Sequence, residues 1–372
     1  MKMITLKIDD PIQIILKLSG STCNINCVYC YEKRRVYEDD EYLSEESLKA
    51  FLNTLGERNI SIQLHGGEPL VIGMEKMKAI FKVLKEYKGN VDVSIQSNAV
   101  LLTEEWLDFF ESEWPNIEIG LSIDGDEYAN SYRVDYKNRD INEKIEKALI
   151  LCSDRKRNIG IIAVANNRLM GRAKEVLTYF SKFSCIKVIN FTPCFDYNIS
   201  QQILDKNHIP EWAITPMEYA DFIIDIFKEW KNSGFFNNFL IEPIFSIMRV
   251  LNGKSTRLCH FNHQKCSHMF TLYPNGVIGS CDELISKDML KVNINEFINF
   301  NEVVKDQEKN LIIKKMKSLM EICDSCKYEK SCMGGCLNTR LNYLDTIYEK
   351  EYCESRIKMI EEIEKEIKVN VT

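Results

Sequence analysis

The sequence lacks several features that would place it in a membrane or on a nucleic acid. Its 372 residues contain no apolar run of the roughly 18 residues that a membrane-spanning helix needs. The first residues are interrupted by Lys2, Lys7, Asp9 and Asp10, so they lack the apolar core of a secretory signal peptide. No basic block stands out and the net charge is −7, which disfavours nucleic-acid binding. We therefore expect a cytoplasmic protein with no membrane or nucleic-acid partner.

Cysteine, by contrast, is plentiful. The chain has 14 cysteines, and in a cytoplasmic protein such a number indicates metal or redox chemistry rather than disulfides. A chain of this length buries most of the surface that its unfolded form exposes, so it does not need metal ions to stabilise its fold.

The pattern of apolar residues predicts an α/β fold. Strand patterns alternate with helix patterns through the first half of the chain, which favours βα units and a parallel sheet. The predicted strands are residues 12–18, 60–64, 91–96, 117–123, 159–165 and 186–192, and the helices between them are 44–55, 75–87, 103–111, 141–152 and 172–180. Further helices are predicted at 217–230, 241–250 and 354–368.

The chain changes character near residue 252, where cysteines and glycines become dense and turn-rich pieces replace long elements. We predict four parts, which are a barrel core (1–195), a helical connector (196–252), a cysteine-rich domain (253–353) and a C-terminal helix (354–372).

The most informative stretch is a cysteine triplet, Cys23, Cys27 and Cys30, directly after the first predicted strand. Thiolates favour zinc, copper(I) or iron–sulfur clusters, and a structural zinc site or a fully ligated cubane takes four ligands. Three thiolates would leave one iron of a 4Fe–4S cubane open for a substrate. The alternatives are a zinc knuckle or thiols that are neighbours by accident.

This spacing resembles the signature of the radical S-adenosylmethionine (radical SAM) enzymes. The resemblance implies a partial (β/α)6 barrel of the TIM type, open at one side. It also implies that the open iron binds S-adenosylmethionine, whose reductive cleavage gives a 5′-deoxyadenosyl radical. Tyr29 matches an aromatic position that lies near the adenine in this family.

A second motif, Gly66-Gly67-Glu68-Pro69, follows the second predicted strand. Alone it reads as an ordinary βα turn, but by resemblance it is the motif that holds the methionine amino group. The resemblance also implies contacts to the sulfonium, ribose or carboxylate from later strand ends, namely Ser97, Asn98, Ser122, Asp124 and the downstream Arg133. For Ser97 and Asn98, turn chemistry is an equal alternative.

The C-terminal cysteines resemble a SPASM domain, an extension of radical enzymes that modify peptides and proteins. Its expected fold is a short β-hairpin, here residues 270–279, with helices. By resemblance, two auxiliary 4Fe–4S clusters bring the total to three, unless these cysteines form zinc ribbons. The first auxiliary ligand set is Cys259, Cys266, Cys281 and Cys336, and the second is Cys323, Cys326, Cys332 and Cys353.

The expected function is oxidation of a peptide or protein substrate, with a flavodoxin- or ferredoxin-type electron donor. We expect a carbon–carbon or thioether crosslink in a ribosomally made peptide, with sulfatase maturation to formylglycine as the alternative. Sulfatase-maturing enzymes tend to have Gln at the position of His65, and this departure favours the crosslinking hypothesis. Only 22 residues precede Cys23, too few for a leader-binding domain, so a leader would be recognised elsewhere.

Asp282 follows Cys281 directly, and by resemblance it accepts a proton from the substrate. Capping of the loop is an equal alternative. An electron-transfer protein with three clusters and a zinc-bound interaction protein are the remaining functional hypotheses.

Overall fold

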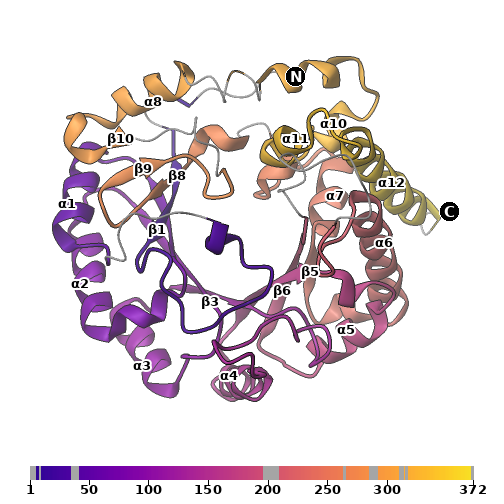
Figure 1. Cartoon of the computed structure of the whole chain (residues 1–372), viewed down its shortest axis with the longest axis horizontal. Coiled ribbons are helices and arrows are strands. Elements are labelled where there is room, and N and C mark those ends of the chain that lie inside the picture. The colour runs from indigo at the N-terminus through magenta and orange to yellow at the C-terminus, as the bar shows by residue number, and fades with distance from the viewer. Residues whose placement is uncertain are drawn as a thin grey trace.

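The computed structural model describes residues 6–7, 10–34, 42–195, 209–262, 265–284, 292–309, 314 and 317–369. Its centre is a curved sheet of ten strands in the order β10-β9-β8-β1-β2-β3-β4-β5-β6-β7, surrounded on its outer face by helices (Figure 1). Neighbouring strands from β8 through β1 to β7 are parallel. The predicted partial barrel is therefore confirmed.

Six of these strands lie where the sequence predicted them. They are β1 (Ile12–Lys17), β2 (Ile60–His65), β3 (Val91–Ser97), β4 (Glu118–Ser122), β5 (Ile159–Ala165) and β6 (Ile186–Pro193). Alternate residues of β1 face the helices and are buried, as Ile14 and Leu16 show. The intervening positions, Gln13, Ile15 and Lys17, face the lumen of the barrel, because side chains alternate along a strand.

The helices that follow these strands carry their apolar residues toward the sheet. They are α1 (Glu45–Thr54), α2 (Gly73–Glu86), α3 (Glu104–Glu113), α4 (Asn142–Asp154), α5 (Ala173–Ser181) and α6 (Pro216–Asn232). Ser44 caps α1 as predicted, with its side chain accepting a hydrogen bond from Ser47 N at 3.0 Å.

The sheet extends beyond the six predicted strands at both edges. Strand β7 (Leu240–Glu242) pairs in parallel with β6, in a region for which we predicted only helix, so α7 begins at Ile244 and ends at Leu251. At the other edge, β8 (Met269–Leu272) pairs in parallel with β1. It forms the predicted hairpin with β9 (Val277–Gly279), beside which lies β10 (Val292–Asn293). The cysteine-rich region thus continues the barrel sheet.

The remaining helices lie around the open side of the barrel (Figure 1). They are α8 (Phe300–Lys309), the one-turn α10 (Glu329–Cys332), α11 (Leu337–Tyr343) and α12 (Tyr348–Val369). Helix α12 begins earlier than the predicted residue 354 and packs along α6, where Lys231 Nζ lies 2.5 Å from Glu366 Oε2.

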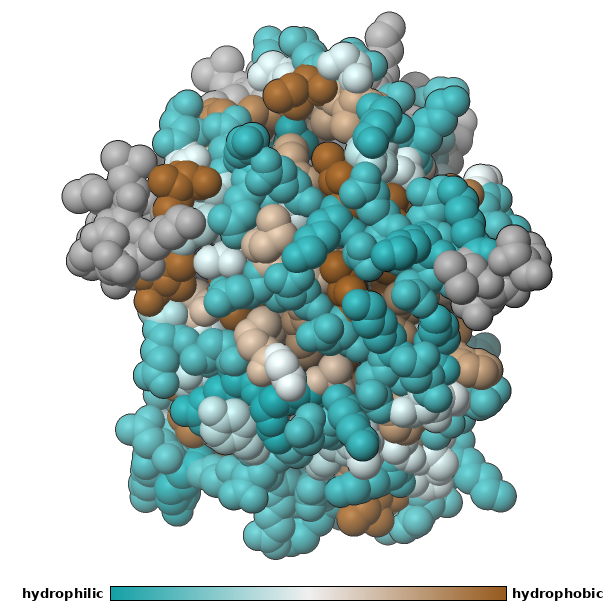
Figure 2. All heavy atoms as spheres, turned by 90° about the vertical axis from the view of Figure 1, so that its right-hand side faces the viewer, coloured by the Kyte–Doolittle hydropathy of each residue, from teal (hydrophilic) through white to brown (hydrophobic). Residues whose placement is uncertain are grey.

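The outer face formed by α5, α6 and α12 is mainly hydrophilic and carries only separate apolar spots (Figure 2). This matches amphipathic helices whose other side packs on the sheet. Within the part of the chain that the structure describes, no helix has the length and apolarity needed to cross a membrane.

Candidate active site and cluster ligands

The cysteine triplet lies in the loop that follows β1, at the carboxyl end of the parallel strands, where barrel enzymes place their chemistry. The pKa of the Cys23 thiol is raised to about 12, mainly by burial and in smaller part by the negative charges of Glu68, Cys27 and Cys30. These groups therefore lie close together, although none of the three cysteines forms a disulfide. Three gathered thiols fit three irons of a cubane, so the donor set suits the implied cluster.

The glycine pair after β2 packs directly against this cysteine loop. Gly67 N donates to Gly20 O at 2.8 Å, and Glu68 N donates to Thr22 O at 2.9 Å. A Cβ atom on Gly67 would lie 2.2 Å from Thr22 O, so no side chain fits there. A Cβ atom on Gly66 would likewise lie 2.6 Å from Ser19 Oγ. Both glycines therefore pack closely against the cysteine loop, and their contacts hold it in place.

Glu68 ties the ends of β2 and β3 together. Its buried carboxylate accepts hydrogen bonds from Asn98 N at 2.7 Å, Ser97 Oγ at 2.9 Å and Leu70 N at 3.1 Å. Burial raises the pKa of Glu68 to about 7, against the opposing effect of these hydrogen bonds. The side chain of Asn98 continues the contact to the cysteine loop, donating to Asn24 Oδ1 at 2.7 Å.

Tyr29, Asp124 and Arg133 form a second group. The Tyr29 hydroxyl donates to Asp124 Oδ2, and Arg133 Nη2 donates to Asp124 Oδ1 at 2.8 Å. Asp124 Oδ1 also accepts from Val164 N at 2.9 Å. Asp124 and Arg133 are therefore paired with each other inside the protein, whereas the Ser122 hydroxyl accepts a hydrogen bond from Gln96 Nε2 at 2.8 Å.

A buried lysine, which we did not single out in the sequence, lies at the centre of a further cluster. Lys17 ends β1 and is fully buried. Its Nζ lies 2.5 Å from Glu32 Oε1, 2.9 Å from Asp282 Oδ2 and 3.2 Å from His65 Nδ1. Tyr31 Oη also donates to Asp282 Oδ2, at 2.9 Å.

The donor atoms of Glu32, His65 and Asp282 lie within 4.8 Å of one another, a spacing that could hold a metal ion. The Lys17 ammonium contacts all three groups and supplies the positive charge there. Asp282 and His65 had been noted in the sequence, and the signal for Lys17 was a charged residue in a strand that is mainly apolar.

The C-terminal cysteines gather in two sets. Burial raises the pKa of Cys281 well above its usual range, and among the negative groups that raise it further are Asp282, Cys266, Glu283 and Cys259. Burial raises the pKa of Cys336, and the negative charge of Glu283 adds to this shift, so Cys336 lies in the same neighbourhood.

In the other set, burial raises the pKa of Cys323, Arg340 opposes this shift, and Cys332, Cys353 and Cys326 reinforce it. Four thiols without a disulfide suit a fully ligated cubane. The division of these cysteines into two cluster sites stays a prediction. Tyr352 joins the two sets, since it precedes Cys353 and its hydroxyl accepts from Cys336 N at 2.8 Å.

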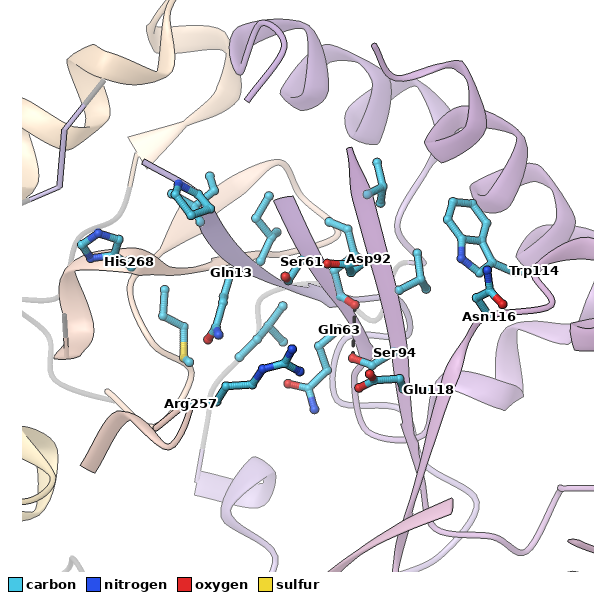
Figure 3. A pocket seen from close by; sticks show the side chains of 18 of the residues that line it. Gln13, Ser61, Gln63, Asp92, Ser94, Trp114, Asn116, Glu118, Arg257 and His268 are labelled. Atoms are coloured by element: carbon cyan, nitrogen blue, oxygen red, sulfur yellow. Dashed lines mark hydrogen bonds between the residues drawn. The ribbon is translucent and has the colours of Figure 1, made fainter. Parts of the chain in front are cut away.

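A cavity of about 950 Å³ opens at the amino ends of β1 to β4 (Figure 3). The strand register aligns Ile15 with Gln63 and Gln63 with Ser94, and these line its inner part. Lys17 and His65 are paired two residues further along the same strands, about 7 Å higher in the barrel. The cavity therefore ends one row of side chains below the Lys17 cluster.

Polar and charged groups face one another across this cavity. Figure 3 shows Arg257, from the segment after α7, reaching toward Gln63, with Ser94 and Glu118 beyond it. Arg257 and Glu118 are both exposed in the cavity. Among the described residues they form no ion pair with each other, so both charges are available to a ligand.

Comparison with known proteins supports the interpretation of the motifs. Residues 18–170 match the model of the Radical SAM superfamily. The chain is 26% identical over 355 residues to the serine-type anaerobic sulfatase-maturating enzyme of Bacteroides thetaiotaomicron, covering 89% of this chain and 84% of that protein. It is also 26% identical over 361 residues to the cysteine-type anaerobic sulfatase-maturating enzyme of Clostridium perfringens, covering 93% and 94%.

Solved structures share the fold. Native anSMEcpe with bound AdoMet and Cp18Cys peptide superposes with a TM-score of 0.81 at 23% identity, covering 97% of this chain and 99% of the other. Streptococcus suis SuiB bound to S-adenosylmethionine has a TM-score of 0.61 at 14% identity, covering 90% and 74%. The chain thus contains a radical SAM domain within a fold shared with both proteins, as the motifs predicted.

One expectation is wrong. We favoured crosslinking of a ribosomally made peptide over sulfatase maturation, partly because of His65. Relatives that match about nine tenths of the chain include sulfatase-maturating enzymes of both the serine and the cysteine type. A single substitution beside the glycine motif was too weak a signal to outweigh similarity over most of the chain.

Proposed function

We propose that the chain is an anaerobic sulfatase-maturating enzyme, which oxidises a Ser or Cys side chain of a protein substrate to formylglycine. The observation that carries this proposal beyond similarity is the placement of Asp282. This carboxylate enters the lumen beside the auxiliary thiols and is held by Lys17 and by Tyr31, the neighbour of Cys30. It thus lies between the two regions that would hold the clusters.

Loss of one hydrogen atom, one proton and one electron converts a –CH2–OH group to an aldehyde and a –CH2–SH group to a thioaldehyde. Water then hydrolyses the thioaldehyde to the aldehyde and releases hydrogen sulfide. When bound, a reduced 4Fe–4S cluster with S-adenosylmethionine supplies hydrogen-atom abstraction, and auxiliary clusters supply an electron acceptor. The proton is the part that the protein's own side chains can take, and Asp282 is our candidate for this base. Lys17 and Tyr31 orient its carboxylate by hydrogen bonds to Oδ2.

The residues that would hold the first cluster are Cys23, Cys27 and Cys30. Of the residues proposed for S-adenosylmethionine, Glu68 carries the charge suited to an ammonium group, and Ser97 and Asn98 fix its carboxylate. Tyr29, Ser122, Asp124 and Arg133 stay proposals for the rest of the cofactor, with Asp124 and Arg133 acting as one paired unit. Three clusters in total are proposed from eleven cysteines.

The substrate would enter through the cavity at the amino ends of β1 to β4. This route is supported by the position of the cavity directly below the Lys17 cluster. An extended peptide could place its Ser or Cys side chain beside Asp282 while neighbouring residues contact the Gln, Ser and charged groups of the cavity wall. A flavodoxin- or ferredoxin-type protein is the proposed electron donor.

The test is anaerobic. The protein is reconstituted, its iron and sulfide are counted, and it is incubated with dithionite, S-adenosylmethionine and a sulfatase peptide in Ser and Cys versions. We expect about twelve irons per chain, 5′-deoxyadenosine, and an aldehyde in the peptide that reacts with a hydrazide. Deoxyadenosine without an aldehyde in either peptide would refute sulfatase maturation, and zinc without sulfide would refute the radical chemistry altogether.

A further inference from the structure

Two arginines contact the sulfur atoms of the second auxiliary cysteine set. Arg340 Nη1 lies 3.7 Å from Cys323 Sγ and 3.7 Å from Cys353 Sγ. Arg356 Nε lies 3.2 Å from Cys332 Sγ. Three of the four thiols in this set thus have a guanidinium donor at their sulfur.

The backbone holds both guanidinium groups in place. Arg340 donates from Nη2 to Leu319 O at 3.1 Å and from Nη1 to Gly334 O at 3.3 Å. Arg356 is only 5% exposed and donates from Nη2 to Cys332 O at 2.8 Å. Neither arginine forms an ion pair with a carboxylate among the described residues, so the sulfurs are the negative partners that these two cations meet.

The first auxiliary set has the opposite electrostatic surroundings. Asp282 follows Cys281 directly, and the acidic side chains of Asp282 and Glu283 both act on its thiol. Glu283 acts on Cys336 as well. The first set therefore has two carboxylates beside it, one of them paired with the Lys17 ammonium, whereas the second set lies against two guanidinium groups.

This difference bears on reduction potential. A cluster with four thiolate ligands is anionic and gains one more negative charge on reduction, so nearby cations and hydrogen bonds to its sulfurs favour the reduced state. Nearby carboxylates disfavour it. The potential is a property of the ligand surroundings and is independent of which substrate the enzyme oxidises.

We propose that Arg340 and Arg356 tune the cluster held by Cys323, Cys326, Cys332 and Cys353, giving it a higher reduction potential than the one held by Cys259, Cys266, Cys281 and Cys336. The two arginines thereby determine which of the two auxiliary clusters is reduced first. The inference requires iron–sulfur clusters at these cysteines but not sulfatase maturation. A failed formylglycine assay would leave it standing.

The experiment is a redox titration followed by electron paramagnetic resonance. It uses the full chain with Cys23→Ala, Cys27→Ala and Cys30→Ala, so that only auxiliary clusters contribute signals. We expect two separate midpoint potentials. Arg340→Gln and Arg356→Gln should each lower the higher midpoint potential by about 59 mV, which for one electron is about tenfold in the equilibrium constant of reduction. The lower midpoint potential should stay unchanged.

The matched control is Arg157→Gln, which removes a barrel arginine that donates to the backbone of Pro115 and Ile117. It should move neither potential. If a Gln variant loads less iron, Arg340→Lys and Arg356→Lys replace it, because they keep the charge and lose the planar contact to sulfur; a smaller downward shift is expected. Unchanged potentials in fully loaded variants, a fall in the lower potential instead, or zinc at these cysteines would overturn the proposal.

Discussion

Replacing Lys17 by Met removes the charge at the centre of the buried cluster while keeping a side chain of similar length. The ammonium is fully buried, and the side chains of its carboxylate partners among the described residues, Glu32 and Asp282, are 6% and 10% exposed. Removing one partner from a buried ion pair costs about 3–5 kcal/mol, because the remaining charge is left without a partner in a region of low polarity. Since domains are stabilised by only about 5–15 kcal/mol, this loss is large.

The assay is urea denaturation of the metal-free chain, in which we expect the free energy of unfolding of Lys17→Met to fall by about 3–5 kcal/mol. Lys17→Arg keeps the charge and should recover part of the loss. Lys85→Met is the surface control, because Lys85 pairs with Glu113 on the exposed face and such pairs contribute about 0–1 kcal/mol. A Lys17→Met chain within about 0.5 kcal/mol of the unmodified chain would refute the reasoning.

Four further outcomes are expected. Asp282→Asn should still form deoxyadenosine with peptide present, but aldehyde formation should fall by about 10²–10⁴-fold, and an unchanged ratio of the two products would exclude Asp282 as the base. Gly67→Ala should lower the iron bound at the cysteine triplet, because the added Cβ would lie 2.2 Å from a backbone carbonyl oxygen. The control is Gly160→Ala, whose Cβ would lie 3.2 Å from a valine methyl, and this variant should bind iron normally. In the metal-free chain Glu68 keeps its proton up to about pH 7, whereas unfolded chains release it near 4.5. Between these two pH values the folded state binds more protons than the unfolded state, so the free energy of unfolding falls as the pH rises from 4.5 to 7. In paired denaturation curves we expect a loss of about 3 kcal/mol relative to Glu68→Gln, which has no carboxyl group to titrate. Arg257→Ala should raise KM for the peptide while peptide-independent cleavage of S-adenosylmethionine stays constant; an unchanged KM would place the substrate elsewhere.

The sequence predicted those parts of the fold that have local signals. The strands from β1 to β6 are apolar runs bounded by turns, and the hairpin of β8 and β9 encloses Pro274-Asn275-Gly276, a turn sequence. Strand β7 spans only Leu240–Glu242, which is too short for an alternating pattern to be seen beside the helix that follows it. Pairing of β8 with β1 joins segments about 250 residues apart, and no local pattern records such a contact.

The candidate site divides in the same way. Cysteine spacing indicated metal or cluster chemistry, whereas the division of the C-terminal cysteines into two ligand sets came from the resemblance and stays a prediction. The partners of Asp282 come from separate elements, with Lys17 at the end of β1 and Tyr31 after the cysteine triplet. Only the fold brings these together. By resemblance Gly67 belongs to the motif that holds the methionine amino group. The sequence could not show that this position also packs so closely against the cysteine loop that no side chain fits.

The connection between the two halves of the molecule follows from the edge of the sheet. Because β8 adds to β1, the hairpin that carries the auxiliary thiols is a part of the barrel, and the chain leaving β9 runs into Cys281 and Asp282. Asp282 then contacts Lys17, the last residue of the strand to which the hairpin is attached. Changes that weaken the pairing of β8 with β1 should therefore disturb both the auxiliary thiols and the proposed base, even when every cysteine is retained. A barrel cut off before β8 would lose Asp282 and leave the Lys17 ammonium without this carboxylate. For this reason we expect the cysteine-rich region to be required for a stable active site as well as for electron transfer.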